Sequence, residues 1–270
     1  MLKHMKSAQP SEFLSMLAEV AWHAGEIILS HYEKEEIAAR RKEDHSPVTN
    51  ADEEAEEFIL ARLAHLAPGA AVIAEEEVAS GRVRAIGERF FLVDPLDGTK
   101  EFLSRNGEFT VNIAEIVRKR PMRGIVYAPA KQRLFMGEAP GCAFEIKTEL
   151  HALPHFNAVK RISARLPDAD GLVAVASRSH RDLQTDDFLK RNNVKQFVIA
   201  GSSLKFCLVA AGEADIYPRH GRTMEWDIAA GHAVLSAAGG SVSQLNGKAL
   251  IYGKSDEGFA NPNFVARGLT

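Results

Sequence analysis

The apolar residues of this 270-residue chain change their spacing twice, and this restricts the possible folds more than any other feature. Between residues 11 and 66 they recur every three or four positions, which predicts amphipathic helices. From residue 70 to about 150 they form short runs separated by turn residues, which predicts strands. Beyond residue 160 apolar runs alternate with helical patterns. The chain must therefore combine helices with two differently built sheets.

The helical part contains two helices. Residues 11–36 predict a long amphipathic helix with Ser11 as its N-cap. An acidic-faced helix is expected over residues 52–66, where Asp52 opens it and Pro68 and Gly69 end it.

The middle part predicts a largely antiparallel sheet, because its apolar runs are joined by gaps of hairpin length. The runs are AAVIA, RFFLVD, TVNIAEIV, GIVYAP, RLFMGE and CAFEIK.

The last part predicts a βαβ-type layer with a mixed sheet. Its strands are LVAVAS, QFVIA and ADIYP, and its helices are expected near 180–192, 202–211 and 227–238. We place a domain boundary within 151–160, which divides the chain into residues 1–155 and residues 156–270. The fold class is α/β, with α and β layers stacked on one another.

Composition excludes several functions. The net charge of −3 provides no broad basic surface, so we expect no nucleic-acid polymer as a partner. Cys142 and Cys207 form no CxxC pair, which argues against a thiolate zinc site and favours a reducing cytoplasm. Since there is no apolar signal core and no run of about 18 apolar residues, we expect neither export nor a transmembrane segment.

The stretch DPLDGT, residues 94–99, places two carboxylates close together after an apolar run. A type I turn starting at Asp94 would bring Asp97 near it. Two adjacent carboxylates are tolerated when a hard cation such as Mg²⁺ neutralises them, and the Leu96 carbonyl could join as a ligand. The simpler alternative is a turn in which Asp97 caps a helix.

Three other acidic segments are compatible with such a site, although each also has a simple structural explanation. The glutamates of IAEEEV could form a solvated turn, and Asp52 could be a plain N-cap. Asp227 follows a tryptophan at an expected helix start, where a lone aspartate would be a cap.

Several common catalytic motifs are missing from the sequence. There is no GxxxxGK[ST], GxGxxG, HExxH or GxSxG pattern. His151 and His155 lie four residues apart, but Pro154 argues against a helical pair of metal ligands.

Together, four segments resemble the inositol monophosphatase superfamily of Mg²⁺-dependent phosphatases. They are TNAD at 49–52, EE at 75–76, DPLDGTKEF at 94–102 and WDIAAG at 226–231. Lys100 and Glu101 stand where inositol phosphatases usually have Thr-Asn. At these positions the chain resembles the CysQ-type branch of the superfamily, the 3'(2'),5'-bisphosphate nucleotidases. The resemblance spans nearly the whole chain and implies a sugar-phosphatase-like αβαβα sandwich.

The resemblance also implies a metal centre. Glu75, Asp94 and the Leu96 carbonyl would bind one Mg²⁺, and Asp94, Asp97 and Asp227 would bind a second. The pattern is compatible with a third, weaker ion. Ala74 stands where the family usually has glycine or serine, but the side chain at this position is not a ligand in the family pattern.

The catalytic residues follow from the same resemblance. Thr99 and Glu76 would orient the attacking water, and Asp52 would hold the Thr99 hydroxyl. Gly98 and Thr99 would bind the scissile phosphate. The reaction implied is in-line hydrolysis of adenosine 3',5'-bisphosphate to AMP and phosphate, which removes a by-product of sulfate assimilation, without a covalent enzyme intermediate.

Substrate specificity is implied by a basic residue. Arg219 stands where inositol phosphatases tend to have a glutamate, and a guanidinium suits a second phosphate. It could instead be a surface arginine, and Lys205 could be a solvated helix residue. Tyr217 is a further candidate. The full set implied to bind substrate is Glu75, Leu96, Asp97, Gly98, Thr99, Lys100, Ser203, Lys205, Arg219 and Asp227.

Other functions stay open at this stage. Phosphatases of the haloacid-dehalogenase type use DxDGT, but here the spacing is three residues with a proline inside. A non-catalytic metal- and nucleotide-binding sensor is a second alternative. Inositol 1-phosphate and fructose 1,6-bisphosphate are alternative substrates on the same fold. We expect a monomer or homodimer. The expected location is the cytoplasm, with peripheral association with the inner face of the membrane as an alternative.

Overall fold

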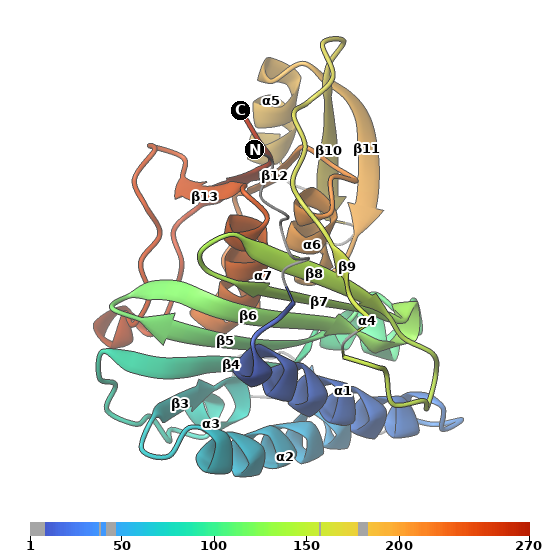
Figure 1. Ribbon diagram of the computed structural model, residues 1–270, viewed down its shortest axis with the longest axis vertical. Helices are drawn as coiled ribbons and strands as arrows, with labels where there is room; N and C mark the ends of the chain where they lie inside the picture. Colours follow the sequence, from blue (N-terminus) through green and yellow to red (C-terminus); the bar gives the residue numbers. More distant parts are fainter. Residues whose placement is uncertain (1–8, 38, 42–46, 157, 178–182) are drawn as a thin grey trace, which may run out of the picture.

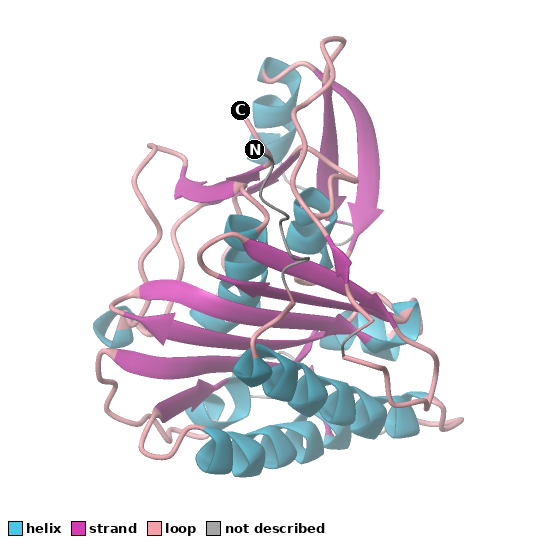
Figure 2. Ribbon diagram, viewed as in Figure 1, coloured by secondary structure: helices cyan, strands magenta, loops and turns pink. Residues whose placement is uncertain are grey.

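The computed structural model describes residues 9–37, 39–41, 47–156, 158–177 and 183–270. It stacks five layers (Figures 1 and 2). Helices α1 (Glu12–Tyr32) and α2 (Asn50–Leu66) cover one face of a seven-stranded sheet. Helices α6 (Leu204–Ala210) and α7 (Glu225–Ala237) lie between this sheet and a five-stranded sheet. Helix α5 (Leu183–Arg191) covers the outer face of the second sheet, which confirms the expected αβαβα sandwich.

The seven-stranded sheet has the order β3-β4-β5-β6-β7-β8-β9. Its strands are β3 (Ala71–Ala74), β4 (Arg89–Asp97), β5 (Thr110–Val117), β6 (Arg120–Ala128), β7 (Arg133–Glu138), β8 (Cys142–Lys147) and β9 (Lys160–Arg161). All neighbours are antiparallel, as expected, except the β3–β4 pair, which is parallel. Because parallel strands end at the same edge, Glu75 after β3 and Asp97 at the end of β4 lie on one side of the molecule.

The apolar runs of this sheet are continuous because both of its faces are buried. In β4, Phe91 and Val93 face the core under α1 and α2, whereas Phe90 and Leu92 face the core shared with α6 and α7. Successive side chains of a strand point to opposite faces, so such a strand needs apolar residues at every position.

Helix α7 lies close against the seven-stranded sheet because both surfaces carry small residues. A Cβ atom added at Gly124 of β6 would lie 2.3 Å from the Ala230 carbonyl oxygen. A Cβ added at Gly137 of β7 would lie 2.6 Å from the Cα of Val234. This contact brings the start of α7, with Asp227, against the sheet that carries Asp94 and Asp97.

The five-stranded sheet has the order β11-β10-β12-β14-β13 and is mixed, as expected. Its strands are β10 (Leu172–Ser177), β11 (Val194–Ala200), β12 (Ile216–Arg219), β13 (Ser241–Gln244) and β14 (Phe264–Arg267). Strand β10 pairs in parallel with β11 and β12, and the other pairs are antiparallel.

The smaller elements connect the layers. They are β1 (Ala39–Arg41), β2 (Pro47–Thr49), α3 (Glu75–Ala79), α4 (Thr99–Leu103) and two 3-10 turns at Pro129–Lys131 and Ser255–Glu257. The core between the two sheets combines residues from both halves of the chain. The division at residue 155 stays a prediction.

Two local expectations were wrong. The N-cap of α2 is Thr49, and Asp52 is the third residue of the helix. Asp94 to Asp97 do not form a separate turn: β4 continues to Asp97, with one extra residue in β4 relative to β5 between the Asp94–Asn112 and Asp97–Thr110 pairs. Such a bulge bends the strand while pairing resumes beyond it. The start expected for α5 at residue 180 lies outside the described residues.

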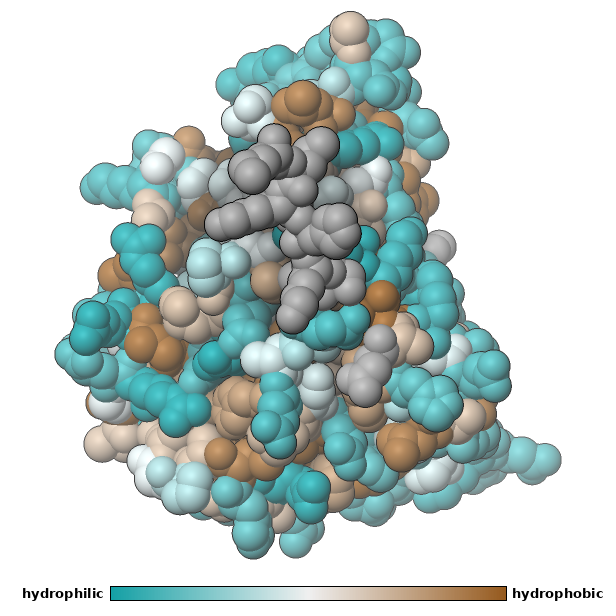
Figure 3. Space-filling model, in the orientation of Figure 1, coloured by the Kyte–Doolittle hydropathy of each residue, from teal (hydrophilic) through white to brown (hydrophobic). Residues whose placement is uncertain are grey.

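Helix α1 is long and apolar enough to meet simple length and composition criteria for a membrane span. Its apolar residues nevertheless pack into the core beneath the seven-stranded sheet, and its N-cap is Ser11, as expected. The hydrophobic side chains visible in Figure 3 lie in small patches among hydrophilic ones, which is normal for a protein surface. The core therefore accounts for the apolar character of α1.

Candidate metal and phosphate site

One cavity of about 260 Å³ lies where the end of β4, the start of α4, the start of α6 and the start of α7 meet. Its lining combines carboxylates, basic side chains and two glycines, drawn from both halves of the chain. The sequence-predicted residues in the lining are Glu75, Asp97, Gly98, Thr99, Lys100, Lys205, Tyr217, Arg219 and Asp227. The fold therefore brings together residues that lie up to about 150 positions apart.

Thr99 is oriented by the start of α2. Its hydroxyl donates to Asp52 Oδ1 at 3.3 Å, while Asp52 Oδ2 accepts from the Thr49 N–H at 2.8 Å and from the Thr49 hydroxyl at 2.7 Å. Asp52 thus completes the helix cap with one oxygen and contacts Thr99 with the other. Asp52 and Thr99 are therefore in contact, and the catalytic roles that the resemblance implies for them stay predictions.

Asp97 and Asp227 are linked through Ser203. The Ser203 N–H donates to Asp97 Oδ2 at 2.7 Å, and the Ser203 hydroxyl donates to the Asp227 carbonyl oxygen at 2.6 Å. Ser203, which the resemblance implied to bind substrate, is buried, and its neighbour Ser202 lines the pocket instead. A Cβ atom at Gly98, whose φ is +94°, would lie 2.3 Å from Ser202 Oγ, so this close approach requires glycine.

The pocket floor concentrates negative charge. Burial raises the pKa of Asp97 to about 6, Lys205 opposes this shift and Glu75 adds to it. Burial, followed by the charges of Asp97 and Glu75, raises the pKa of Asp227 well above its usual range. The charge of Glu75 thus disfavours ionisation of Asp97, and the charges of Glu75 and Asp97 disfavour that of Asp227, which is the situation a bound cation relieves. The oxygen donors present suit Mg²⁺.

The remaining predicted metal ligands, and the predicted catalytic residue Glu76, lie behind or beside this lining. Asp94 and Leu96 are buried, and the Leu96 N–H donates to Asp94 Oδ1 at 3.1 Å. The Leu96 carbonyl accepts the Thr99 hydroxyl at 3.4 Å. Glu76 lines a neighbouring groove with other glutamates of α2 and α3. Among the described residues, no three acidic, histidine or cysteine side chains already stand in a metal-ligating arrangement.

Two basic residues face the carboxylates. Lys205 is only 6% exposed, and its ammonium lies 5.4 Å from the centre of the Tyr217 ring. Burial lowers the pKa of Lys205 to about 8, against the opposing effect of Asp97. Arg219 has a buried Nε–H without an acceptor among the described residues. Since buried donors are usually bonded, this group is well suited to an anionic ligand.

Sequence reasoning missed some residues of the site. Glu56 of α2 is buried and accepts the N–H groups of Glu76 and Glu77, each at 2.8 Å. Burial raises the pKa of Glu56 to about 7. Its spacing of four residues from Asp52 on one helix was a usable signal, because such residues share a face. Arg222 and Thr223 also line the pocket, and no motif marks them.

The chain is similar to proteins of one known family. The model of the inositol monophosphatase family matches residues 9–269. The chain is 43% identical over 252 residues to the 3'(2'),5'-bisphosphate nucleotidase CysQ of Salmonella typhimurium, covering 93% of this chain and 98% of the relative. It is 37% identical over 260 residues to the CysQ of Buchnera aphidicola, covering 96% and 94% respectively.

Solved structures show the same relationship. The crystal structure of CysQ from Bacteroides thetaiotaomicron, described as a bacterial member of the inositol monophosphatase family, aligns with a TM-score of 0.77 at 38% identity, over 95% of this chain and 97% of that one. An IMPase from Thermotoga maritima shares the fold, with a TM-score of 0.76 at 24% identity over 95% and 92% of the chains. The chain therefore belongs to the inositol monophosphatase family.

Proposed function

We propose that this protein is a Mg²⁺-dependent 3'(2'),5'-bisphosphate nucleotidase that hydrolyses adenosine 3',5'-bisphosphate to AMP and phosphate. The observation that carries the proposal is one pocket in which Glu75, Asp97 and Asp227 face Lys205 and Arg219. The high identity to several CysQ nucleotidases over almost their full length supports the same activity.

We assign the metal ligands as the resemblance implies. Glu75, Asp94 and the Leu96 carbonyl would hold one ion, and Asp94, Asp97 and Asp227 a second, with a weaker third ion compatible with the pattern. When bound, Mg²⁺ would neutralise the clustered carboxylates and supply Lewis-acid stabilisation of the charge that develops during phosphoryl transfer. The mutual repulsion of Asp97, Asp227 and Glu75 supports this assignment.

The chain's own residues would orient the reactants. Hydrolysis forms a bond from water oxygen to phosphorus and breaks the bond from phosphorus to the ester oxygen, which leaves with a proton. Because Asp52 accepts the Thr99 hydroxyl proton, the Thr99 oxygen keeps lone pairs that can accept from the attacking water. Glu76 would be the second group that orients this water. The N–H groups of Gly98 and Thr99 would hold the scissile phosphate.

The basic residues would select a substrate with two phosphates. Arg219 offers a buried donor that lacks a protein acceptor among the described residues, and Lys205 presents a second cation on the same side. A second phosphate would satisfy both groups, whereas an inositol ring carrying one phosphate would leave them without an anion. Lys100 would contribute at the exposed edge of the site, and the buried Ser203 would contribute through its contacts with Asp97 and Asp227.

A substrate panel tests the proposal. Phosphate release is measured at one Mg²⁺ concentration with adenosine 3',5'-bisphosphate, inositol 1-phosphate and fructose 1,6-bisphosphate. We expect the highest kcat/KM for the nucleotide. A preference for inositol 1-phosphate would contradict the substrate assignment but not the fold.

We also propose a cytoplasmic location. Cys142 and Cys207 are both free thiols, which supports this location because the cytoplasm keeps thiols reduced. Peripheral association with the inner face of the membrane and the choice between monomer and homodimer stay predictions, which vesicle sedimentation and light scattering would test.

A further inference from the structure

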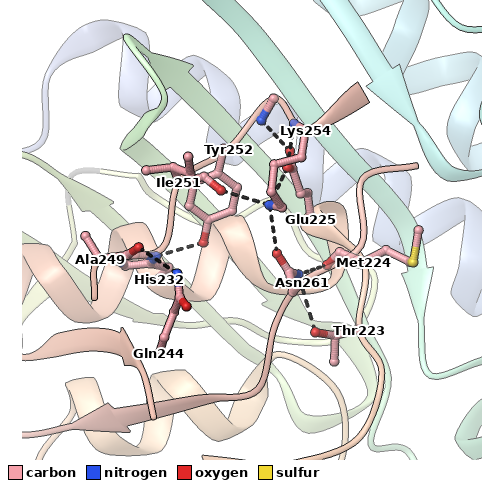
Figure 4. A network of polar contacts seen from close by, with 11 residues as sticks. Thr223, Met224, Glu225, His232, Gln244, Ala249, Ile251, Tyr252, Lys254 and Asn261 are labelled. Carbon is pink, nitrogen blue, oxygen red and sulfur yellow. Dashed lines mark hydrogen bonds and ion pairs between the residues drawn. The ribbon is translucent and has the colours of Figure 1, made fainter. Parts of the chain in front are cut away.

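Glu225, the first residue of α7, is completely buried although it carries a carboxylate. Figure 4 shows how the loop after β13 surrounds it. Glu225 accepts the Gly253 N–H at 2.7 Å, the Lys254 N–H at 2.9 Å and the Lys254 ammonium at 2.6 Å. Separating a buried carboxylate from its partners strongly destabilises a protein. This set of contacts therefore fixes the loop to the start of α7.

Asn261 makes a second connection between the same two segments. Its side-chain amide donates to the Met224 carbonyl at 2.6 Å and to the Thr223 hydroxyl at 3.3 Å, while its backbone N–H donates to the Thr223 carbonyl at 2.9 Å. The Lys254 ammonium lies 3.4 Å from the Asn261 side-chain oxygen. Residues 223–225 are thus bonded along their length to residues 253–261 (Figure 4).

The loop is itself anchored to both halves of the protein. The Tyr252 hydroxyl lies 2.7 Å from Nδ1 of His232 on α7 (Figure 4). The Tyr252 N–H donates to the carbonyl of Lys119, in the turn between β5 and β6 of the seven-stranded sheet. The loop therefore relates the start of α7 to the sheet that carries Asp94 and Asp97.

The bonded segment leads directly into the pocket. The Met224 N–H donates to Asp227 Oδ2 at 2.7 Å, so the position of Met224 determines that of the Asp227 carboxylate. Thr223 lines the pocket itself. A shift of residues 223–225 would move a carboxylate of the pocket floor and part of the pocket wall together.

We propose that Glu225, Lys254 and Asn261 form a positioning clamp that holds the Asp227 carboxylate in place for metal binding. The proposal rests on the proposed function, because it takes Asp227 to be a metal ligand. None of the three clamp residues is among the described residues that line the pocket, so the clamp acts through Met224 and Thr223.

The test measures metal binding apart from turnover. Tb³⁺ is titrated into the full-length protein, and its luminescence is excited through tryptophan, since Trp226 adjoins Asp227. The Lys254→Met variant removes the ammonium and keeps most of the apolar stem. Lys147→Met is the control, because it removes an exposed ammonium that pairs at 2.9 Å with another buried glutamate, Glu145 on β8.

We expect Lys254→Met to weaken Tb³⁺ binding about tenfold or more, as is typical when a partner that orients a metal ligand is lost. The Mg²⁺ concentration for half-maximal turnover should rise by a similar factor, while the nucleotide KM at saturating Mg²⁺ stays within about twofold. Lys147→Met should leave both metal measurements unchanged.

Opposite outcomes separate the two proposals. If Lys254→Met melts at a lower temperature but binds Tb³⁺ as tightly as Lys147→Met, the network only stabilises the fold and the clamp is refuted. If Lys254→Met does not fold, Asn261→Ser takes its place, and unchanged Tb³⁺ affinity refutes the clamp equally. If the wild type shows no Tb³⁺ binding that Mg²⁺ displaces, the metal assignment of the proposed function fails instead.

Discussion

Replacing Arg219 with methionine should remove selectivity for a second phosphate. Among the described residues, the guanidinium donates to the Arg222 carbonyl alone, at 3.4 Å, and its Nε–H has no acceptor. The substitution therefore leaves few protein groups unpaired. Its main effect should be confined to the bound state.

The size of the effect follows from the bonds lost. A hydrogen bond between charged groups contributes about 1.5–3 kcal/mol, which corresponds to about a 10- to 150-fold loss in kcat/KM. Arg219 also lowers the pKa of Asp227, so its removal would strengthen proton competition at the metal site for every substrate. Saturating Mg²⁺ at pH 8 reduces this common loss.

The assay compares two nucleotides that differ by one phosphate. For Arg219→Met, kcat/KM for adenosine 3',5'-bisphosphate should fall by the factor given above, and that for adenosine 3'-monophosphate should change by less than about threefold. Arg219→Lys should be intermediate, because it keeps the charge but not the planar donor pair. Arg62→Met, an exposed change on α2, is the control. Equal losses for both nucleotides, or no loss, would refute the role of Arg219.

Three further predictions concern the scaffold. Glu56→Ala should raise the half-saturating Mg²⁺ concentration about tenfold, because it removes the acceptor of two backbone N–H groups at the start of α3; an unchanged Mg²⁺ titration would contradict this. Gly124→Ala should cost about 1–3 kcal/mol in urea unfolding, since the new Cβ meets the carbonyl of Ala230, whereas Gly87→Ala, with no described atom within 4 Å, should not. Burial lowers the pKa of His232 to about 4. As the pH falls from about 6.5 to 4, the unfolded chain therefore binds a proton at this histidine that the folded protein does not bind. The free energy of unfolding should fall by about 3 kcal/mol over this range. His232→Gln should flatten this part of the pH profile, and an identical profile would count against it.

The strands were predictable because the central sheet is covered on both sides. Residues 90–93 form an uninterrupted apolar run, and such runs mark a strand with two buried faces. The segment after Asp227 contains the small residues Ala229, Ala230 and Gly231, which allow close packing, and the structure places this helix against Gly124 and Gly137. Patterns of this kind depend only on neighbouring residues.

Details that depend on distant residues were not predictable in the same way. The bulge at Pro95 arises from the pairing of β4 with β5, which local sequence does not reveal. Taken alone, the local sequence favoured a turn. The contact between Glu225 and Lys254 joins residues 29 positions apart, and no local pattern marks either of them. Which acidic side chains line the pocket and which lie behind it, as Asp94 does, is decided by the packing of several elements.

The central claim is that carboxylates from both halves of the chain form one metal-dependent phosphatase site. The most direct test is phosphate release from adenosine 3',5'-bisphosphate with saturating Mg²⁺ by Asp94→Asn and Asp227→Asn, with circular dichroism as a check on folding. We predict that both variants keep the wild-type spectrum and lose turnover almost completely. A near-normal rate in either folded variant would contradict the claim.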